Sequence, residues 1–289
     1  MPIRTILVPV ANADSSKPTI ETALIVASMF SSHIDALHVR IDPKETLPLL
    51  GEGMSGTLIQ DMIEFAEKES DERAKKAFAL FKGYCDGRKI PLVDKASMSK
   101  FVTAGWTEVS GREDDHVSIR GRLNDLIVVG RPLADSDTPS PTTLNAALFE
   151  TGRAVLVAPP MAPEVLGKKV VIFWRGSTEA SRAIAAGMPF IWRAETVKIV
   201  SALADQATRA SAEGLATYLA WHGVNAEVET LTATDGKAVG SRLLDSAQKF
   251  QADLLVMGAY THSRVRQLIL GGVTQKVLAE ATIPVVMAH

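Results

Sequence analysis

The sequence predicts an α/β fold of two tandem, doubly wound domains, each with about five mostly parallel strands. Two observations predict it: short apolar runs recur in the same order in both halves of the chain, and segments of helical character separate them. The runs are about four to eight residues long and rich in β-branched residues, as strands buried on both faces are. Alternation of such strands with helices predicts parallel sheets with right-handed crossovers.

The repeat also sets the domain organisation. The stretch 159–167 between the two halves contains Pro and Gly, so we expect a first domain over residues 1–162 and a second over 163–289. Each apolar run of the first half has a counterpart in the second half: Ile6–Val10 with Val170–Trp174, Leu126–Gly130 with Leu254–Gly258, and Ala154–Val157 with Pro284–Met287.

Four segments between these runs fit helices. Pro18 stands near the start of the first segment, where proline is tolerated, and Ser177 is a candidate N-cap of the second. The segments are Thr19–Phe30, Glu179–Ile184, Ala207–Trp221 and Ser241–Phe250.

The first half of the chain is longer than the second. We expect the extra residues within about 43–75, and a helix rich in Glu and Lys over roughly 57–84. A solvated face is the simpler interpretation of such a charged helix. A lid or a partner-docking element is the alternative.

Composition excludes several function classes. Lys and Arg total 31 against 33 for Asp and Glu, so broad binding of nucleic acid is not expected. The single cysteine, Cys85, allows neither an intrachain disulfide nor a Cys-rich zinc site, and we expect it to be inert. The histidines show no metal-ligand spacing. No apolar stretch reaches the ~18 residues of a transmembrane helix, and we expect a cytoplasmic protein.

One segment of the second half suits an anionic ligand. The strand that ends in Gly258 is followed by a loop that carries His262 and Arg264 and has no acidic residue, and Gly271 and Gly272 then open a helix. Glycine lets the backbone approach a ligand closely, and a helix N-terminus offers free N–H groups and the positive end of its dipole. In an open parallel sheet this loop lies where ligands bind, outside the carboxyl ends of the strands.

This segment, the strand order and the duplication resemble a tandem universal stress protein of the UspA family. The resemblance covers nearly the whole chain and implies a Rossmann-like fold of the adenine nucleotide alpha hydrolase type. ATP-binding members carry Gly-x2-Gly-x9-Gly-[Ser/Thr] at this position. Gly258 and Gly271 match the first and third elements, whereas Thr261 stands where the second glycine belongs and Gly272 where Ser or Thr belongs.

The family's other nucleotide contact is an Asp at the end of the first strand. Arg175 stands there in the second half, although Gly176 and Ser177 keep the pattern. A cation at this place suits a phosphate or carboxylate ligand, but replacing the Asp removes an acidic contact to the base or sugar. Trp174 beside it is either a base-stacking residue or an apolar residue at a strand end. Ala202 aligns roughly where the family places an apolar residue against adenine.

The first half departs further from the family pattern. Gly130 is followed by an acidic loop with Asp135 and Asp137, and Thr142 and Thr143 stand at the helix start in place of glycine. The carboxylates repel phosphate, so we expect no ATP in the first domain. The acidic loop is a candidate cation site, but solvated carboxylates are the simpler interpretation.

The resemblance implies a stress-response protein that binds an adenine nucleotide, ATP or a relative, in its second domain only, with Mg²⁺ as a candidate companion. We expect no catalytic residue, no metal site of the protein's own, and at most slow ATP hydrolysis. The expected nucleotide-binding residues are Trp174, Arg175, Ala202, Gly258, Thr261, His262, Arg264, Gly271, Gly272, Val273 and Thr274.

Two alternatives to nucleotide binding stay open. One is a stress-linked interaction protein that binds no ATP, which the two changed motif positions favour. The other is an enzyme acting on another phosphorylated or acidic small molecule, which Arg175 would suit.

The resemblance also implies how the two domains meet. Single-domain members dimerise through their last strand, so Ala154–Val157 and Pro284–Met287 are expected at an internal pseudo-twofold interface. The chain would then be an intramolecular pseudo-dimer, and a homodimer of whole chains is a further option. Nucleic acid and membranes are not expected partners.

Overall fold

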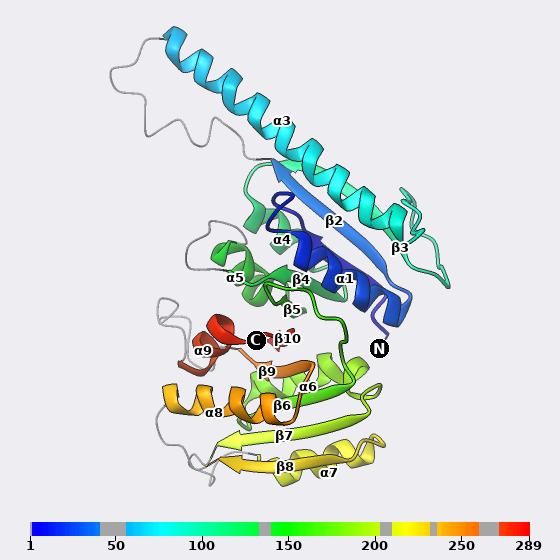
Figure 1. Cartoon of the computed structure of the whole chain (residues 1–289), viewed down its shortest axis with the longest axis vertical. Coiled ribbons are helices and arrows are strands. Elements are labelled where there is room, and N and C mark those ends of the chain that lie inside the picture. Colours follow the sequence, from blue (N-terminus) through cyan, green and yellow to red (C-terminus); the bar gives the residue numbers. More distant parts are fainter. Residues whose placement is uncertain (1, 41–55, 133–139, 203–209, 232–235, 260–271) are drawn as a thin grey trace.

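The computed structural model describes residues 2–40, 56–132, 140–202, 210–231, 236–259 and 272–289 (Figure 1). The strands are β1 Thr5–Pro9, β2 His33–Arg40, β3 Thr103–Ser110, β4 Leu126–Gly130, β5 Ala154–Ala158, β6 Lys169–Trp174, β7 Thr196–Ala202, β8 Ala226–Leu231, β9 Leu254–Gly258 and β10 Val285–Ala288. The helices are α1 Lys17–Phe30, α3 Gly56–Gly87, α4 Glu113–Gly121, α5 Pro141–Glu150, α6 Thr178–Ile191, α7 Ala212–Trp221, α8 Gly236–Lys249 and α9 Gly272–Glu280.

The described strands form one ten-stranded sheet in the order β3-β2-β1-β4-β5-β10-β9-β6-β7-β8. Within each half of the chain, neighbouring strands run parallel. The outer-to-inner order is the same in both halves, since β3-β2-β1-β4-β5 corresponds to β8-β7-β6-β9-β10. The predicted α/β class and the repeated parallel topology are confirmed.

The two halves meet where β5 and β10 pair antiparallel. The residues in register are Val157 with Val285, Leu156 with Val286, and Val155 with Met287, and all six are at most 2% exposed. These are the strands that the resemblance placed at the internal interface. The division of the chain at residues 162 and 163 stays a prediction.

The twist of the sheet explains the direction in which the outer strands of the two halves end. In Figure 1, β2 and β7 both end toward the left of the view, although they belong to halves joined by an antiparallel pair. A right-handed twist of strands accumulates over many neighbours and turns the outer strands of one half relative to those of the other. The carboxyl ends of β2 and β7 therefore point to the same side in this view.

Helices cover both faces of the sheet, as a doubly wound fold requires. On one face, Leu24 of α1, Phe81 of α3, Ile184 of α6 and Leu219 of α7 belong to one buried cluster. On the other face, α4, α5, α8 and α9 contribute to a second cluster, for which Val117, Leu148, Leu243 and Val277 are the representatives. Successive strand residues divide between the clusters, because side chains on a strand alternate between its faces.

The helix starts follow local capping chemistry. Pro18 occupies the first turn of α1, and the Ser177 hydroxyl accepts a hydrogen bond from the Ala180 N–H at 3.2 Å, which confirms Ser177 as the N-cap of α6. The predicted start of the next helix at Ala207 is not supported by the described residues. The helix α7 begins at Ala212, because the Ser211 hydroxyl caps it by accepting from the Gly214 N–H at 3.0 Å. Residues 207–209 lie outside the described residues.

The charged helix of the first half is α3, which is 32 residues long. Its C-terminal part packs on the sheet through residues such as Ala77 and Phe81. Its N-terminal part extends beyond the end of β2 (Figure 1) and leaves Phe65 70% exposed. The charged side chains between Asp61 and Arg73 are exposed, as a solvated face requires. Of the expected extra residues, 43–55 lie outside the described part of the chain.

The helices of the described ranges offer no membrane-spanning candidate, since none combines sufficient length with an apolar stretch.

Cys85 lies on the buried face of α3. It is fully buried, and burial, reinforced by the neighbouring charge of Asp86, raises the pKa of its thiol to about 11. The thiolate is the nucleophilic form, so the native thiol has neither the charge nor the access that alkylation needs.

We therefore expect iodoacetamide to leave Cys85 unmodified in the folded protein at about pH 8 and to alkylate it readily in denaturant. Intact-mass measurement over time checks this. Equal rates in the folded and unfolded protein would contradict the burial of Cys85.

Candidate functional site

The candidate site of the second half lies at the carboxyl ends of β6 and β9, where the connections that follow these two strands diverge. These strands are neighbours in the sheet, with Phe173 in register with Met257. The helix α6 leaves the end of β6 on one face of the sheet, and α9 lies on the other face. A crevice between strands whose connections diverge to opposite faces is the usual ligand position in an open α/β sheet.

Gly258 ends β9 against the first turn of α6. A Cβ atom at this position would lie 2.5 Å from the Ala180 backbone nitrogen and 2.7 Å from the Glu179 carbonyl carbon. Both atoms belong to the backbone and cannot move aside cheaply. Gly258 is therefore required for close packing of helix on strand, which is a role that the sequence alone did not assign to it.

The end of β6 turns sharply into α6. Trp174 is 7% exposed, and its indole Nε1 donates a hydrogen bond to the Ala210 carbonyl at 2.9 Å. This geometry fits the packing interpretation of Trp174 rather than base stacking. Arg175 follows and is exposed, and Gly176 has a φ of +64°, the left-handed conformation that glycine adopts without strain.

Ala202 lies at the end of β7, next to the end of β6. Trp174 is in register with Ser201, so Ala202 is one residue further along the neighbouring strand. Its side chain is half-buried. The structure therefore brings Ala202, Trp174 and Gly258 to one edge of three adjacent strands.

The helix α9 begins at Gly272, as predicted. Gly272 is exposed, Val273 is half-buried and Thr274 is 5% exposed. A Cβ on Gly240 of α8 would lie 2.9 Å from the Cβ of Lys276, so the first turns of α9 pack closely on α8. The other expected residues of this loop, Thr261, His262, Arg264 and Gly271, lie outside the described residues.

Glu179 in the first turn of α6 is a charged residue near Gly258 that the sequence motifs did not indicate. Burial acts to raise the pKa of its carboxyl, but a backbone N–H, the Ser177 and Thr178 hydroxyls and the charge of His289 together hold that pKa below its usual value. An acidic residue in the first turn complements the helix dipole. Its position at the start of a helix is the signal that could have revealed it.

Arg131 connects the first half to the helix of the candidate site. Its guanidinium Nη1 donates a hydrogen bond to the carbonyl of Ala281, directly after α9. Burial lowers the pKa of Arg131, and its buried Nε has no hydrogen-bond partner among the described atoms. A cation at the C-terminal end of α9 suits the helix dipole, so the first half stabilises the end of α9 opposite to Gly272.

A second contact crosses the same boundary. The ring of Phe149 at the end of α5 meets the His289 ring edge-on, with centroids 4.7 Å apart. The His289 Nδ1 also lies 3.1 Å from the Ala259 carbonyl, which follows Gly258. The edge of the candidate site is thus held by contacts from both halves.

Within the described ranges, no group of three or more His, Cys, Asp or Glu residues is arranged to hold a metal ion.

Comparisons with known proteins find similarity to universal stress proteins, in the second half by a family model and over the whole chain by a relative. The model of the "Universal stress protein family" matches residues 190–289. A universal stress protein from Synechocystis sp. is 24% identical over 300 residues, which cover 98% of this chain and 99% of that protein.

Solved structures share the fold over nearly the whole chain. A universal stress protein from Archaeoglobus fulgidus aligns with a TM-score of 0.63 and 18% identity over 98% of this chain and 95% of its own. A functionally unknown protein from Pseudomonas aeruginosa PAO1 aligns with a TM-score of 0.57 and 14% identity over 99% of this chain and 92% of its own. Both alignments span the two halves, so the tandem arrangement is shared.

The contact at Gly258 gives a stability prediction. We expect Gly258→Ala to lower the free energy of unfolding by about 1–3 kcal/mol, because the new methyl group must push α6 away from β9. Denaturant titration measures the change.

Gly83→Ala is the matched control. Gly83 lies inside α3, and a Cβ there would meet nothing within 4 Å, so we expect it to stabilise the chain by about 0.5–1 kcal/mol. The same small gain in both variants would show that α6 does not approach Gly258 closely.

Proposed function

We propose that this chain, a tandem member of the universal stress protein family, binds an adenine nucleotide in the crevice of its second half and works by binding rather than by rapid catalysis. The observation that carries the proposal is that α9 begins at Gly272, in the connection that follows the end of β9. A helix N-terminus after the carboxyl end of a strand presents free N–H groups and a positive dipole end to an anion.

The phosphates are assigned to the start of α9 and the loop before it. Backbone groups of Gly271, Gly272, Val273 and Thr274 would cradle them. His262 and Arg264 would supply charge from the loop, with Thr261 and Gly258 as its first elements. Mg²⁺ is proposed as a companion of a bound triphosphate.

The nucleoside is assigned to the ends of β6 and β7. Ala202 would contact the base, and Arg175 would supply a positive charge at the strand end. Trp174 would form part of the wall, because its indole is packed and hydrogen-bonded to Ala210. The Arg at position 175 shifts the site toward anionic parts of a ligand and away from a carboxylate contact to the sugar.

A stress-linked interaction protein without ATP is the second candidate. Two observations favour it: Thr261 and Gly272 depart from the family motif, and the buried Trp174 offers little ring surface to a base. The first turn of α6 also carries Glu179, whose charge opposes phosphate. An enzyme acting on a small acidic or phosphorylated substrate is a third, weaker candidate, supported by Arg175 alone.

The proposed assembly rests on the pairing of β5 with β10. We take the halves as domains 1–162 and 163–289 that form an intramolecular pseudo-dimer through β5 and β10. The compartment proposed is the cytoplasm, and neither nucleic acid nor membrane is a proposed partner. A homodimer of whole chains is a further proposal, and sedimentation velocity would test it through the mass of the particle.

Calorimetric titration with ATP tests the assignment of the loop. We expect Arg264→Asp to weaken binding by about tenfold or more, because it removes a charge-assisted hydrogen bond and places a carboxylate near phosphate. Lys249→Asp is the control, because Lys249 is the last residue of α8, outside the proposed site, and the substitution reverses a charge in the same way. Equal affinities of the Arg264→Asp variant and the unaltered chain would remove Arg264 from the site.

A further inference from the structure

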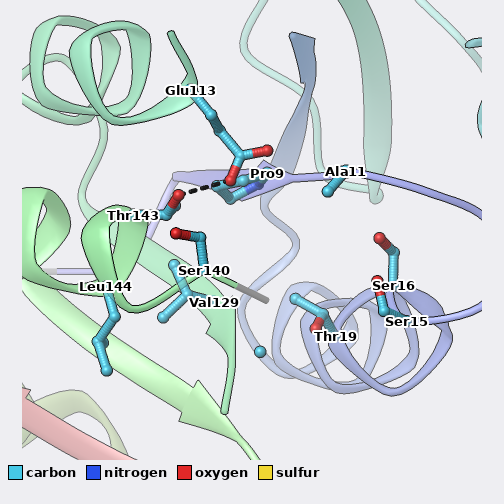
Figure 2. Close-up of a pocket in the computed structure, with 11 residues that line it drawn as sticks. Pro9, Ala11, Ser15, Ser16, Thr19, Glu113, Val129, Ser140, Thr143 and Leu144 are labelled. Atoms are coloured by element: carbon cyan, nitrogen blue, oxygen red, sulfur yellow. Dashed lines mark hydrogen bonds between the residues drawn. The ribbon is translucent and has the colours of Figure 1, made fainter. Parts of the chain in front are cut away.

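The first half has a crevice of its own, in the place that corresponds to the candidate nucleotide site. It lies at the ends of β1 and β4, between the first turns of α1 and α5 (Figure 2). All but one of the polar residues that line it carry a hydroxyl, and the remaining one carries a carboxylate. They are Ser15, Ser16, Thr19, Ser140, Thr143 and Glu113.

Glu113 is the charged group of this crevice. It is the first residue of α4, and its Oε1 accepts a hydrogen bond from the Thr143 hydroxyl of α5 at 2.6 Å. Figure 2 shows the carboxyl group pointing from α4 toward the start of α5. Burial raises the pKa of Glu113, which the Thr143 bond partly offsets and the charge of Asp114 reinforces. The described residues give its other oxygen, Oε2, no hydrogen-bond donor.

The charge of this crevice is opposite to that of the second half. Among the described residues that line it, none is basic, whereas Glu113 is acidic. The positive ends of the α4 and α5 dipoles are already matched by the Glu113 carboxylate and by the Ser140 hydroxyl, which accepts from the Thr142 N–H at 3.2 Å. A phosphate would meet a buried carboxylate with no cation to offset it. The crevice therefore rejects the ligand class that the second half is proposed to bind.

Hydroxyl oxygens and a carboxylate are together an acceptor set. An ammonium group has three donors and no acceptor. It could place one N–H on Glu113 Oε2 and the others on hydroxyl oxygens such as that of Ser16, which makes no capping bond to α1. Pro9, Val129 and Leu144 supply apolar wall for a short aliphatic stem.

We propose that the first-half crevice binds a small aliphatic amine in its ammonium form, with Glu113 as the anionic anchor. This site is separate from the proposed nucleotide site and does not depend on it. A tandem chain with two such crevices would respond to two chemically different ligands.

Three probes of similar size and different charge test the proposal in the full-length chain: ethanolamine, ethylene glycol and glycolate. Amide chemical shifts of isotope-labelled protein are followed during titration. We expect saturable shifts with ethanolamine at residues around Ser16 and Thr143, and none there with glycolate or ethylene glycol. Binding of glycolate or ethylene glycol as tight as that of ethanolamine, or no saturable shift with ethanolamine, would overturn the proposal.

Matched variants then identify the anchor. Glu113→Gln keeps an oxygen that can accept from Thr143 and removes the charge, so we expect ethanolamine binding to weaken by about tenfold or more with the fold retained. Asp115→Asn removes a charge on the same helix, from a side chain that is 70% exposed, and should leave the binding unchanged. Unchanged binding in Glu113→Gln, or an equal loss in both variants, would exclude Glu113 as the anchor.

Discussion

The antiparallel pairing of β5 with β10 is the contact on which the rest of the structure depends. It joins two five-stranded parallel arrays into one sheet, and the six residues in register across it are buried. Without it, each half would expose an apolar strand edge with unpaired backbone groups, which is an aggregation hazard. The pairing also brings Arg131 to the C-terminal end of α9 and Phe149 to His289, so that residues of the first half contact both α9 and the end of β10.

One topology thus carries a crevice in the first half and the proposed nucleotide site in the second, and the two differ in chemistry. Both lie at carboxyl ends of parallel strands and at helix N-termini, where the fold itself favours ligands. In the second half the strand end carries Arg175 and the loop before α9 is basic. In the first half Glu113 crosses from α4 to Thr143 of α5 and places a carboxylate at the helix start. The ligands proposed for the two halves therefore differ because the residues at these strand ends differ, whereas the sheet is shared.

The sequence predicts the fold well because its signals are local. Apolar runs of strand length mark the sheet, and their repetition reveals the two halves. Ser177 is recognisable as an N-cap from its place before Glu179, whereas Ser211 was missed because the apolar pattern before α7 extends further upstream than the helix does.

The details of the sites could not be predicted, because they depend on contacts between residues distant in the chain. Gly258 is needed for the backbone of Ala180, and Glu113 meets Thr143 from a separate helix. Arg131 reaches Ala281 across the boundary between the halves. The hydrogen bond from Trp174 to the Ala210 carbonyl likewise joins residues on separate elements, and it favours the packing interpretation of Trp174.

The most direct test of nucleotide binding by the second half is mass spectrometry of the small molecules released by denaturing freshly purified protein, quantified against the chain concentration. We predict about one adenine nucleotide per chain, because the proposed site of the second half has a basic loop whereas the crevice of the first half presents a carboxylate to phosphate. Two nucleotides per chain would contradict the charge assignment of the first half. A chain that releases none and also fails to bind added ATP would contradict the nucleotide site itself and leave the interaction protein as the function to pursue.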